Sequence, residues 1–260
     1  MPANDLALLI EAAKAAGEIA RRFWRRRPEI WDKPGGAGPV TEADLAVNAM
    51  LQAELGAARP DYGWLSEETP DGPARLGRRS SFIVDPIDGT RAFIDGDTSF
   101  AHSLAVAEDG EITAAVVYLP MRDALYAATR GGTATLNGTP IRASGRTRTR
   151  GATILTSKPS LAPEHWIDGT PPPFRREFRA SLAWRLCLVA EGRFDAMLTL
   201  RPTWEWDIAA GDLIARQAGA RVTDRAGRAI GYNAPEPCAA GVIAAPEPLW
   251  RDLRRALAYG

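Results

Sequence analysis

Two aspartates that follow an apolar run constrain this chain more than any other feature. Residues 82–84 form a buried strand pattern, and Asp85 and Asp88 follow it on either side of Pro86 and Ile87. Burial penalises the charged form of a carboxyl group, so neighbouring acids at a buried strand end need a compensating positive charge. Mg²⁺ can supply that charge, because it binds carboxylate oxygens together with substrate phosphate. The stretch therefore predicts a site for a metal and a phosphate.

The backbone of this stretch favours the same function. Pro86 turns the chain sharply and could present the Ile87 carbonyl as a further oxygen ligand. Gly89 lets a backbone approach closely, and the amides of Gly89 and Thr90 stand where a helix could begin, which is a natural anion site. Pro, Asp and Gly are also the common turn residues, so an ordinary turn explains these residues in isolation equally well.

The composition indicates a globular protein without a general surface for polyanions. Of the 260 residues 45% are hydrophobic and 25% charged, and 32 basic residues balance 32 acidic ones. We therefore expect one large domain or two closely packed halves, and no nucleic-acid polymer as partner. Cys187 and Cys238 match no metal-binding spacing, and no apolar stretch approaches a membrane span, so a cytoplasmic protein with reduced thiols is expected.

Hydrophobic periodicity divides the chain into two halves of different character. Helical patterns, the first over residues 5–27, precede a meander of strands between residues 103 and 128. Residues 1–138 therefore predict an α+β half that carries the metal-binding loop. In residues 139–260 strands and helices alternate, which predicts an α/β half. We expect the two halves to form one compact catalytic unit.

Two further acids lie at the ends of separate elements. Glu67 begins an acidic pair after a short strand, and Asp207 lies near the first turn of a predicted helix. If both converge with Asp85 and Asp88 on two or three Mg²⁺ ions, the site could cleave phosphate esters, because the metals polarise the phosphoryl group and lower the pKa of a bound water. Thr90 could orient that water, with Glu67 as ligand and base.

Asp44 and Lys33 have two interpretations each. Asp44 stands three residues after Thr41 in a T-x-x-D capping box, which explains it, and it could also order a water at the metal. Lys33 lies in a Gly/Pro loop at residues 31–40 that could close over a phosphate or simply connect two elements. His102 has no partner motif, so we expect it to be structural.

Four motifs, in this order, resemble the inositol monophosphatase superfamily of lithium-sensitive Mg²⁺ phosphatases. They are GPVTEAD at 38–44, LSEET at 65–69, DPIDGT at 85–90 and EWDIAAG at 205–211. Four ordered motifs are far more specific than one, and the similarity extends over nearly the whole chain. The resemblance implies a layered αβαβα sandwich and a Mg²⁺-dependent phosphoric monoester hydrolase.

The resemblance also implies roles for individual residues. The implied metal ligands are Glu67, Asp85, the Ile87 carbonyl, Asp88 and Asp207. It implies that Glu67 and Thr90 activate the water and that the amides of Gly89 and Thr90 hold the phosphate. We add Asp44 to the candidate catalytic residues, and Asp88, Asp207 and Lys33 to the candidate contacts of the small phosphate ester. Family members are often dimers, so a homodimer is a further expectation.

Finer features are similar to the 3'(2'),5'-bisphosphate nucleotidase branch. LSEE replaces the glycine-bearing form common in inositol phosphatases, and Leu200 stands seven residues before Asp207, where an inositol-specific branch usually carries glutamate. We therefore expect cleavage of 3'-phosphoadenosine 5'-phosphate to AMP and phosphate. Candidate contacts for the base and the second phosphate are Trp184, Trp204, Arg185 and Arg201. Ordinary core packing is the alternative for both tryptophans. Inositol-1-monophosphatase and histidinol-phosphate phosphatase are the alternatives.

Two hypotheses from other functional classes compete with a phosphatase that uses a metal-activated water. Aspartyl-phosphate phosphatases also carry a D-x-D-G-T loop after an apolar strand, but one residue separates their two acids, whereas Pro86 and Ile87 separate them here. A metal-dependent phospholigand-binding module without turnover would share the fold. Every expected metal ligand is present in the sequence, which argues against such a module.

Overall fold

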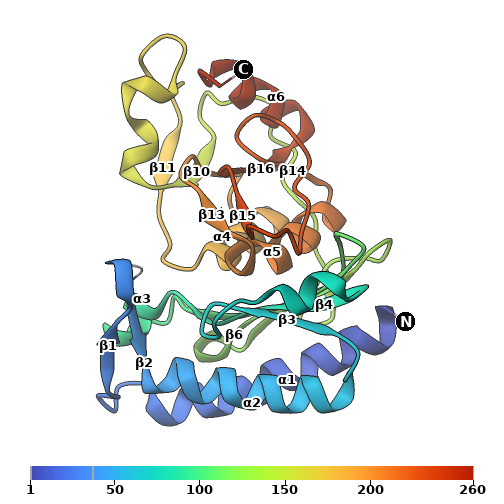
Figure 1. Cartoon of the computed structure of the whole chain (residues 1–260). Coiled ribbons are helices and arrows are strands. Elements are labelled where there is room, and N and C mark those ends of the chain that lie inside the picture. Colours follow the sequence, from blue (N-terminus) through green and yellow to red (C-terminus); the bar gives the residue numbers. More distant parts are fainter. Residues whose placement is uncertain (1, 37, 260) are drawn as a thin grey trace.

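The chain folds into five alternating layers of helices and sheets (Figure 1), in a computed structural model that describes residues 2–36 and 38–259. Helices α1 (Pro2–Phe23) and α2 (Glu42–Ala58) form the first layer and cover a seven-stranded sheet. Helices α4 (Leu182–Ala190) and α5 (Glu205–Gln217) separate it from a five-stranded sheet, whose outer face α6 (Glu247–Ala256) covers. The predicted αβαβα sandwich is confirmed.

The seven-stranded sheet forms the second layer. Its order is β3 (Gly63–Ser66), β4 (Ser80–Asp88), β5 (Ala101–Glu108), β6 (Glu111–Leu119), β7 (Ala124–Thr129), β8 (Thr135–Leu136) and β9 (Thr139–Pro140). Strand β3 runs parallel to β4, and the remaining pairs are antiparallel. Phe82 and Val84 pack under α1 and α2, while Ile83 packs towards α4 and α5. Because both faces are buried, β4 reads as a continuous apolar run.

The five-stranded sheet forms the fourth layer. Its order is β11 (Arg175–Glu177), β10 (Thr153–Thr156), β12 (Ala196–Thr199), β16 (Val242–Pro246) and β14 (Ala220–Thr223). Strand β10 runs parallel to β11 and β12, and β16 is antiparallel to both of its neighbours. Two small sheets, β1 (Ile30–Asp32) with β2 (Pro39–Thr41) and β13 (Thr203–Trp204) with β15 (Cys238–Ala239), flank the layers.

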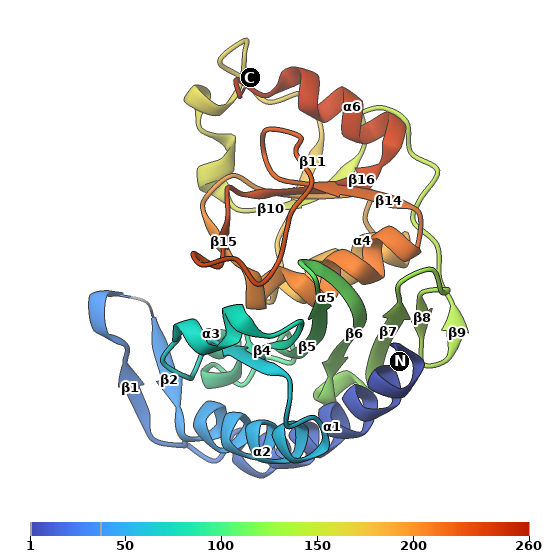
Figure 2. The same cartoon turned by 45° about the vertical axis from the view of Figure 1, so that its right-hand side comes forward.

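Short helices complete the described chain. They are α3 (Thr90–Ile94) and 3-10 turns at Pro34–Gly36, Pro73–Gly77, Pro120–Arg122, Lys158–Leu161 and Pro163–His165. The seven-stranded sheet reaches β9, and the next strand, β10, belongs to the other sheet (Figure 2). The division into residues 1–138 and 139–260 stays a prediction. Within the described residues no helix combines the length and apolarity that a membrane crossing needs.

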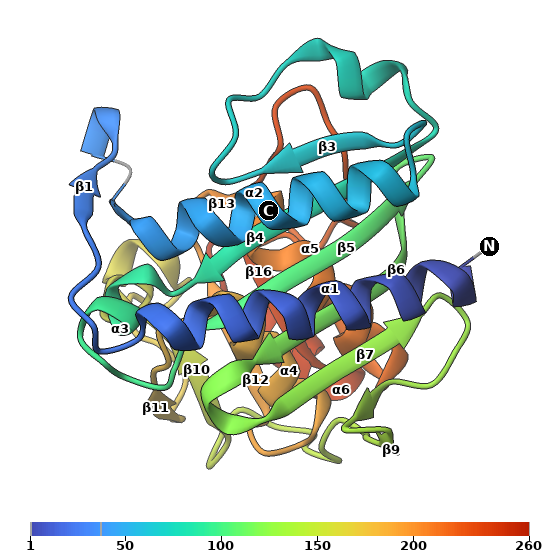
Figure 3. The ribbon, with the colours of Figure 1, turned by 90° about the horizontal axis from the view of Figure 1, so that it is seen from below.

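Helices α1 and α2 lie side by side across the sheet (Figure 3). The expected continuation of the first helix to residue 27 is wrong: α1 ends at Phe23, and Arg25 and Arg27 adopt positive φ values of 59° and 54°. The Arg25 guanidinium stacks on Trp24 and donates to the Gly96 carbonyl, contacts that replace further helix. The predicted capping box of α2 is confirmed, since Thr41 and Asp44 cap each other's backbone amides.

Candidate active site

A cavity of about 1080 Å³ opens where the end of β4 faces the first turn of α5. The side chains that line it carry both charges. The acids that line it are Glu67, Asp85, Asp88 and Asp207, along with Asp95 and Asp97; the arginines are Arg91, Arg122, Arg179, Arg185 and Arg201. A cavity with both a carboxylate cluster and a guanidinium cluster can hold a cation and an anion side by side.

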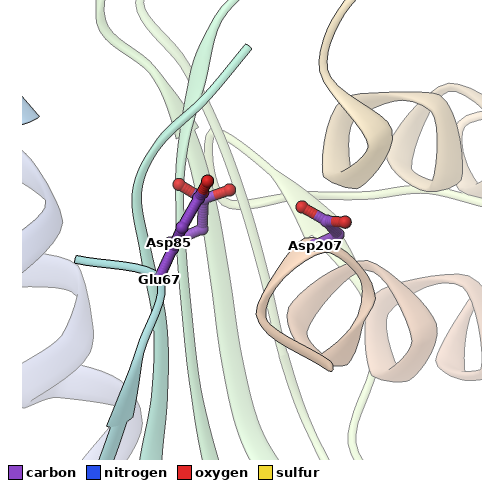
Figure 4. Close-up of side chains that lie close together, drawn as sticks. All are labelled: Glu67, Asp85 and Asp207. Carbon is purple, nitrogen blue, oxygen red and sulfur yellow. The ribbon is translucent and has the colours of Figure 1, made fainter. Parts of the chain in front are cut away.

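Three carboxylates meet in this cavity, from three different elements. One oxygen each of Glu67, Asp85 and Asp207 lies within 4.8 Å of the other two. Glu67 follows β3 and Asp85 lies in the neighbouring β4, while Asp207 faces them from α5 (Figure 4). Parallel pairing of β3 with β4 brings the ends of both strands to one edge of the sheet, and α5 packs across it.

Burial makes this carboxylate cluster unfavourable without a cation. Asp85 is only 1% exposed, and its Oδ2 atom has no hydrogen-bond partner in the described structure. Burial, and then the neighbouring Glu67, raises the pKa of Asp85 well above its ordinary value, and burial followed by Asp88 does the same for Asp207. A bound divalent cation would reverse both effects. Because the donors are all carboxylate oxygens, the cluster fits Mg²⁺.

Asp88 is held differently from the other three acids. It accepts hydrogen bonds from the Ser181 hydroxyl at 2.6 Å and from the amides of Leu182 at 3.1 Å and Ala183 at 2.7 Å. These donors form the N-terminus of α4. Arg91 lies three positions after Asp88, but no ion pair joins the two within the described residues. Burial raises the pKa of Asp88 to about 6, although the three hydrogen bonds lower it.

Thr90 lies between Asp44 and the aspartate loop. Its hydroxyl oxygen is 3.1 Å from Asp44 Oδ1 and 3.2 Å from the Ile87 carbonyl oxygen. The other oxygen of Asp44 accepts from the Thr41 amide at 2.9 Å. Asp44 is 1% exposed, and burial raises its pKa to about 6. Asp44 therefore caps α2 and contacts Thr90 at the same time, while its role towards a water stays a prediction.

Lys33 occupies a position that the sequence did not predict. Its ammonium nitrogen lies 2.6 Å from an oxygen of Glu67 and 2.6 Å from an oxygen of Glu68. It reaches them from the β1–β2 hairpin, whose residues Gly38 and Pro39 line the cavity. In this arrangement Lys33 balances the charge of two carboxylates, and its contact to a phosphate stays a prediction.

The two tryptophans expected to contact a base do not line the cavity. Trp184 is 3% exposed and buried in the core, beneath the guanidinium of Arg122 at 4.7 Å. Stacking of a ligand on Trp184 is therefore excluded, and that expectation is wrong. Trp204 is 45% exposed and stacks on Trp206 at 4.9 Å, but it is not among the cavity residues.

An aromatic residue that the sequence reasoning missed lies in the cavity instead. Phe178 lines it with 48% of its surface exposed, and the Arg185 guanidinium stacks on its ring at 4.3 Å. Arg185 itself is 4% exposed, and its Nε donates to the Arg179 carbonyl at 2.6 Å. Burial, partly offset by Asp88, lowers its pKa to about 10. No sequence signal distinguishes Phe178, because it lies in an irregular segment before α4.

Leu200 does not face the cavity. It is 2% exposed and packs with Ile154 and Ile243 in the outer core, whereas the preceding residue, Thr199, lines the cavity and is 3% exposed. Thr199 ends β12, and successive strand residues point in opposite directions. The side chain relevant to a substrate at this position is therefore a hydroxyl, and the wall still lacks a carboxylate there.

Comparison with known proteins gives one consistent family. The model of the inositol monophosphatase family matches residues 2–258. The inositol-1-monophosphatase of Rhizobium meliloti is 37% identical over 232 residues, covering 85% of this chain and 86% of that protein. The histidinol-phosphatase of Chlorobaculum parvum is 31% identical over 265 residues, covering 98% and 97%.

Solved structures agree with the sequence relatives. The extragenic suppressor protein suhB of Bartonella henselae superposes with a TM-score of 0.83 at 31% identity and covers 99% of both chains. An IMPase of Thermotoga maritima gives a TM-score of 0.82 at 28% identity, covering 98% of this chain and 96% of that one. The likeness extends over both sheets and the cavity between them.

Proposed function

Because this chain belongs to the inositol monophosphatase family and is therefore a phosphatase of phosphate monoesters, we propose that it uses Mg²⁺ and prefers a nucleoside bisphosphate, 3'-phosphoadenosine 5'-phosphate. The observation that carries the proposal is one cavity lined both by the carboxylates and by the cavity arginines, which are Arg91, Arg122, Arg179, Arg185 and Arg201. The carboxylates suit the metal that binds the phosphate to be cleaved. The cavity arginines suit a second anionic group on the same substrate.

The metal would be held by Glu67, Asp85 and Asp207, with Asp88 and the Ile87 carbonyl as further oxygen ligands. The support is the 4.8 Å cluster and the unpartnered Oδ2 of Asp85. When bound, Mg²⁺ polarises the phosphoryl group, offsets its negative charge and lowers the pKa of a coordinated water. The donor set leaves open whether two or three ions bind.

Thr90 and Asp44 would orient the attacking water. If the Thr90 hydroxyl donates to Asp44, which lies 3.1 Å away, its oxygen lone pairs remain available to accept a hydrogen bond from water. Glu67 would take the proton of that water as base. The water oxygen then bonds to phosphorus, the ester P–O bond breaks, and the leaving oxygen takes up a proton. The amides of Gly89 and Thr90 and the ammonium of Lys33 would contact the phosphate.

The substrate preference rests on the cavity arginines and Phe178. Arg179, Arg185 and Arg201 all line the cavity, and charge-assisted hydrogen bonds from guanidinium to phosphate are among the strongest in proteins. The exposed ring of Phe178 offers a stacking surface for a base in place of the two tryptophans. Thr199 supplies no carboxylate acceptor for polyol hydroxyls.

Inositol 1-phosphate and histidinol phosphate are the competing substrates. Two relatives are named for these two activities, which is why both substrates belong in the comparison. Each substrate has one phosphate group only, so neither would use the cavity arginines as a second phosphate site. The comparison of substrates therefore decides between them.

The test is a side-by-side measurement of phosphate release with Mg²⁺ and with a chelator. The substrates are 3'-phosphoadenosine 5'-phosphate, 3'-AMP, inositol 1-phosphate and histidinol phosphate, and lithium is added in a parallel series. The 3'-AMP control has the same ester but no second phosphate. We expect kcat/KM for the bisphosphate to exceed that for 3'-AMP about tenfold or more, since one charged contact contributes about 1.4 kcal/mol or more.

Two outcomes would contradict the proposal. Equal kcat/KM for the bisphosphate and 3'-AMP would exclude a second phosphate site. A preference for inositol 1-phosphate or histidinol phosphate would keep the metal chemistry and replace the substrate.

A further inference from the structure

The aspartate loop that carries the candidate metal ligands is a bulge in the sheet. In the antiparallel pairing of β4 with β5, Asp85 lies opposite Ser103 and Asp88 lies opposite Ala101. Two residues of β4, Pro86 and Ile87, therefore face a single residue of β5. A bulge bends its strand and re-aims the side chains on either side of it. Here it separates Asp85 from Asp88 in the ladder, and the Ile87 carbonyl belongs to the bulged segment.

The single residue opposite this bulge is His102. It is completely buried in β5, and its Nδ1 atom forms a short hydrogen bond with the carbonyl oxygen of Pro86. Pro86 lacks an amide hydrogen, and neither it nor Ile87 has a register partner on β5. The imidazole therefore supplies a side-chain hydrogen bond where the regular ladder is interrupted.

The hydrogen bond determines which nitrogen of His102 carries the proton. A carbonyl oxygen only accepts, so Nδ1 must be the donor. Nε2 is buried and has no partner in the described structure. The ring is enclosed by Phe100 and Tyr118, each with its centroid 6.4 Å away. A second proton on Nε2 would be unsolvated, so burial keeps the ring neutral and lowers its pKa to about 4.

We infer that His102 is a positioning residue for the metal site: its Nδ1 hydrogen bond to Pro86 fixes the bulge in the shape that presents Asp85, the Ile87 carbonyl and Asp88 to the metal site. The inference rests on the metal site of the proposed function. A histidine that only fills the core would affect stability alone. A histidine that fixes the ligand loop must also affect Mg²⁺ affinity. Mutation of residues that hold metal ligands in place typically lowers the metal affinity about 10- to 100-fold.

The experiment measures the heat of Mg²⁺ binding to the full chain without substrate, which separates metal binding from turnover. His102→Val removes the donor. His102→Asn restores it, because the asparagine amide nitrogen can occupy the place of Nδ1. Val106→Ala is the matched control: Val106 lies in the same strand, is buried and packs four residues away from the bulge. The kcat for 3'-phosphoadenosine 5'-phosphate at saturating Mg²⁺ is measured alongside.

We expect His102→Val to bind Mg²⁺ about tenfold or more weakly. The asparagine variant should stay within about threefold of the wild type, and Val106→Ala should lose stability with unchanged Mg²⁺ affinity. Excess Mg²⁺ should restore most of kcat in His102→Val.

Several outcomes separate the inference from the proposed function. If the wild type binds no Mg²⁺, the metal site itself is wrong. If the wild type binds Mg²⁺ and His102→Val binds it equally tightly, the positioning role is wrong. If His102→Asn binds Mg²⁺ as weakly as His102→Val does, the restored donor gives no rescue, and the positioning role is wrong as well. Should His102→Val not fold, the asparagine variant decides alone: tenfold weaker binding in a folded His102→Asn would overturn the role of the donor.

Discussion

Asp88 accepts a hydrogen bond of 2.7 Å from the backbone amide of Ala183, and this contact joins the aspartate loop of the first sheet to the N-terminus of α4. Two more donors from the same helix end, Ser181 Oγ and Leu182 N, complete the contact. A carboxylate at a helix N-terminus is stabilised by the unpaired amides and the helix dipole. Asp88 therefore links the seven-stranded sheet to the middle helix layer, in addition to its candidate role as a ligand.

Asp88→Asn should destabilise the protein more than Asp85→Asn. An amide group at position 88 would place hydrogens against donors of α4, whereas Asp85 Oδ2 has no partner to lose. We expect a difference in unfolding free energy of about 2 kcal/mol, the penalty for a buried donor left unpaired. Urea unfolding of both variants in chelator measures it. Equal stability would show that the α4 contact contributes little.

Asp85→Asn should remove Mg²⁺ binding without loss of the fold. It deletes one charge from a buried cluster of like charges, so the metal-free variant should be as stable as the wild type or more stable. The rise in Tm on addition of Mg²⁺ should disappear, and kcat should fall at least about a hundredfold. Asp252→Asn, at the far end of the chain beside Thr149, should keep the full Mg²⁺ response. A full Mg²⁺ response in Asp85→Asn would contradict the ligand assignment.

Arg201→Ala should affect the bisphosphate selectively. Arg201 is one of the cavity arginines and is exposed, so its removal leaves the core intact. We expect KM for 3'-phosphoadenosine 5'-phosphate to rise about tenfold, with little change for 3'-AMP. Arg193→Ala serves as control, since Arg193 is exposed and pairs with Glu191 outside the cavity. An equal rise of KM for both substrates would argue against contact with the second phosphate.

His102 should make the stability of the protein depend on pH. Burial lowers its pKa in the fold to about 4, with Arg21 adding to the shift, while the unfolded chain has the ordinary value near 6.5. Below pH 6.5 the unfolded state binds the extra proton, so stability falls as the pH falls. Between pH 7.5 and 5 the contribution is about 2 kcal/mol. Urea unfolding of the wild type and His102→Asn at both pH values should show a smaller decrease in the variant; parallel decreases would assign the effect to other groups.

Lys33→Met should strengthen Mg²⁺ binding in the absence of substrate. The Lys33 ammonium lies 2.6 Å from Glu67 and would have to move before a cation used the same oxygen. Removing this competitor should tighten Mg²⁺ binding about fivefold, equivalent to about 1 kcal/mol for a partly exposed ion pair. If Lys33 also contacts the phosphate, KM for the substrate should rise in the same variant. Weaker Mg²⁺ binding would instead indicate that Lys33 supports the site.

Local features of this protein could be predicted because they depend on neighbouring residues. The α2 capping box needs only Thr41 and Asp44, three positions apart, and the buried run of β4 needs only its own apolar side chains. The acids after β3 and at the end of β4 were identified because charged groups at the ends of buried strands need compensation. The order of four such motifs was also sufficient to indicate the family and its layered fold.

Other features depended on contacts between distant segments. Arg91 is close to Asp88 in sequence, but the donors that hold Asp88 come from α4, 93 to 95 positions later. Trp184, in the first turn of α4, is buried beneath two arginines, whereas Phe178, four residues before α4, is exposed in the cavity. Counting seven residues back from Asp207 pointed to Leu200 as the side chain near the substrate. In the structure Leu200 packs in the core, and the preceding residue, Thr199, lines the cavity.

The amino-acid sequence by itself therefore determined the fold class, the acids and the type of chemistry, because periodicity, capping and buried charge act over a few residues. Only the tertiary structure decided which groups meet. Three contacts join separate elements: Lys33 pairs with Glu67, Asp88 accepts hydrogen bonds from the N-terminus of α4, and His102 contacts Pro86. Their geometry depends on the packing of the layers, which no local pattern encodes.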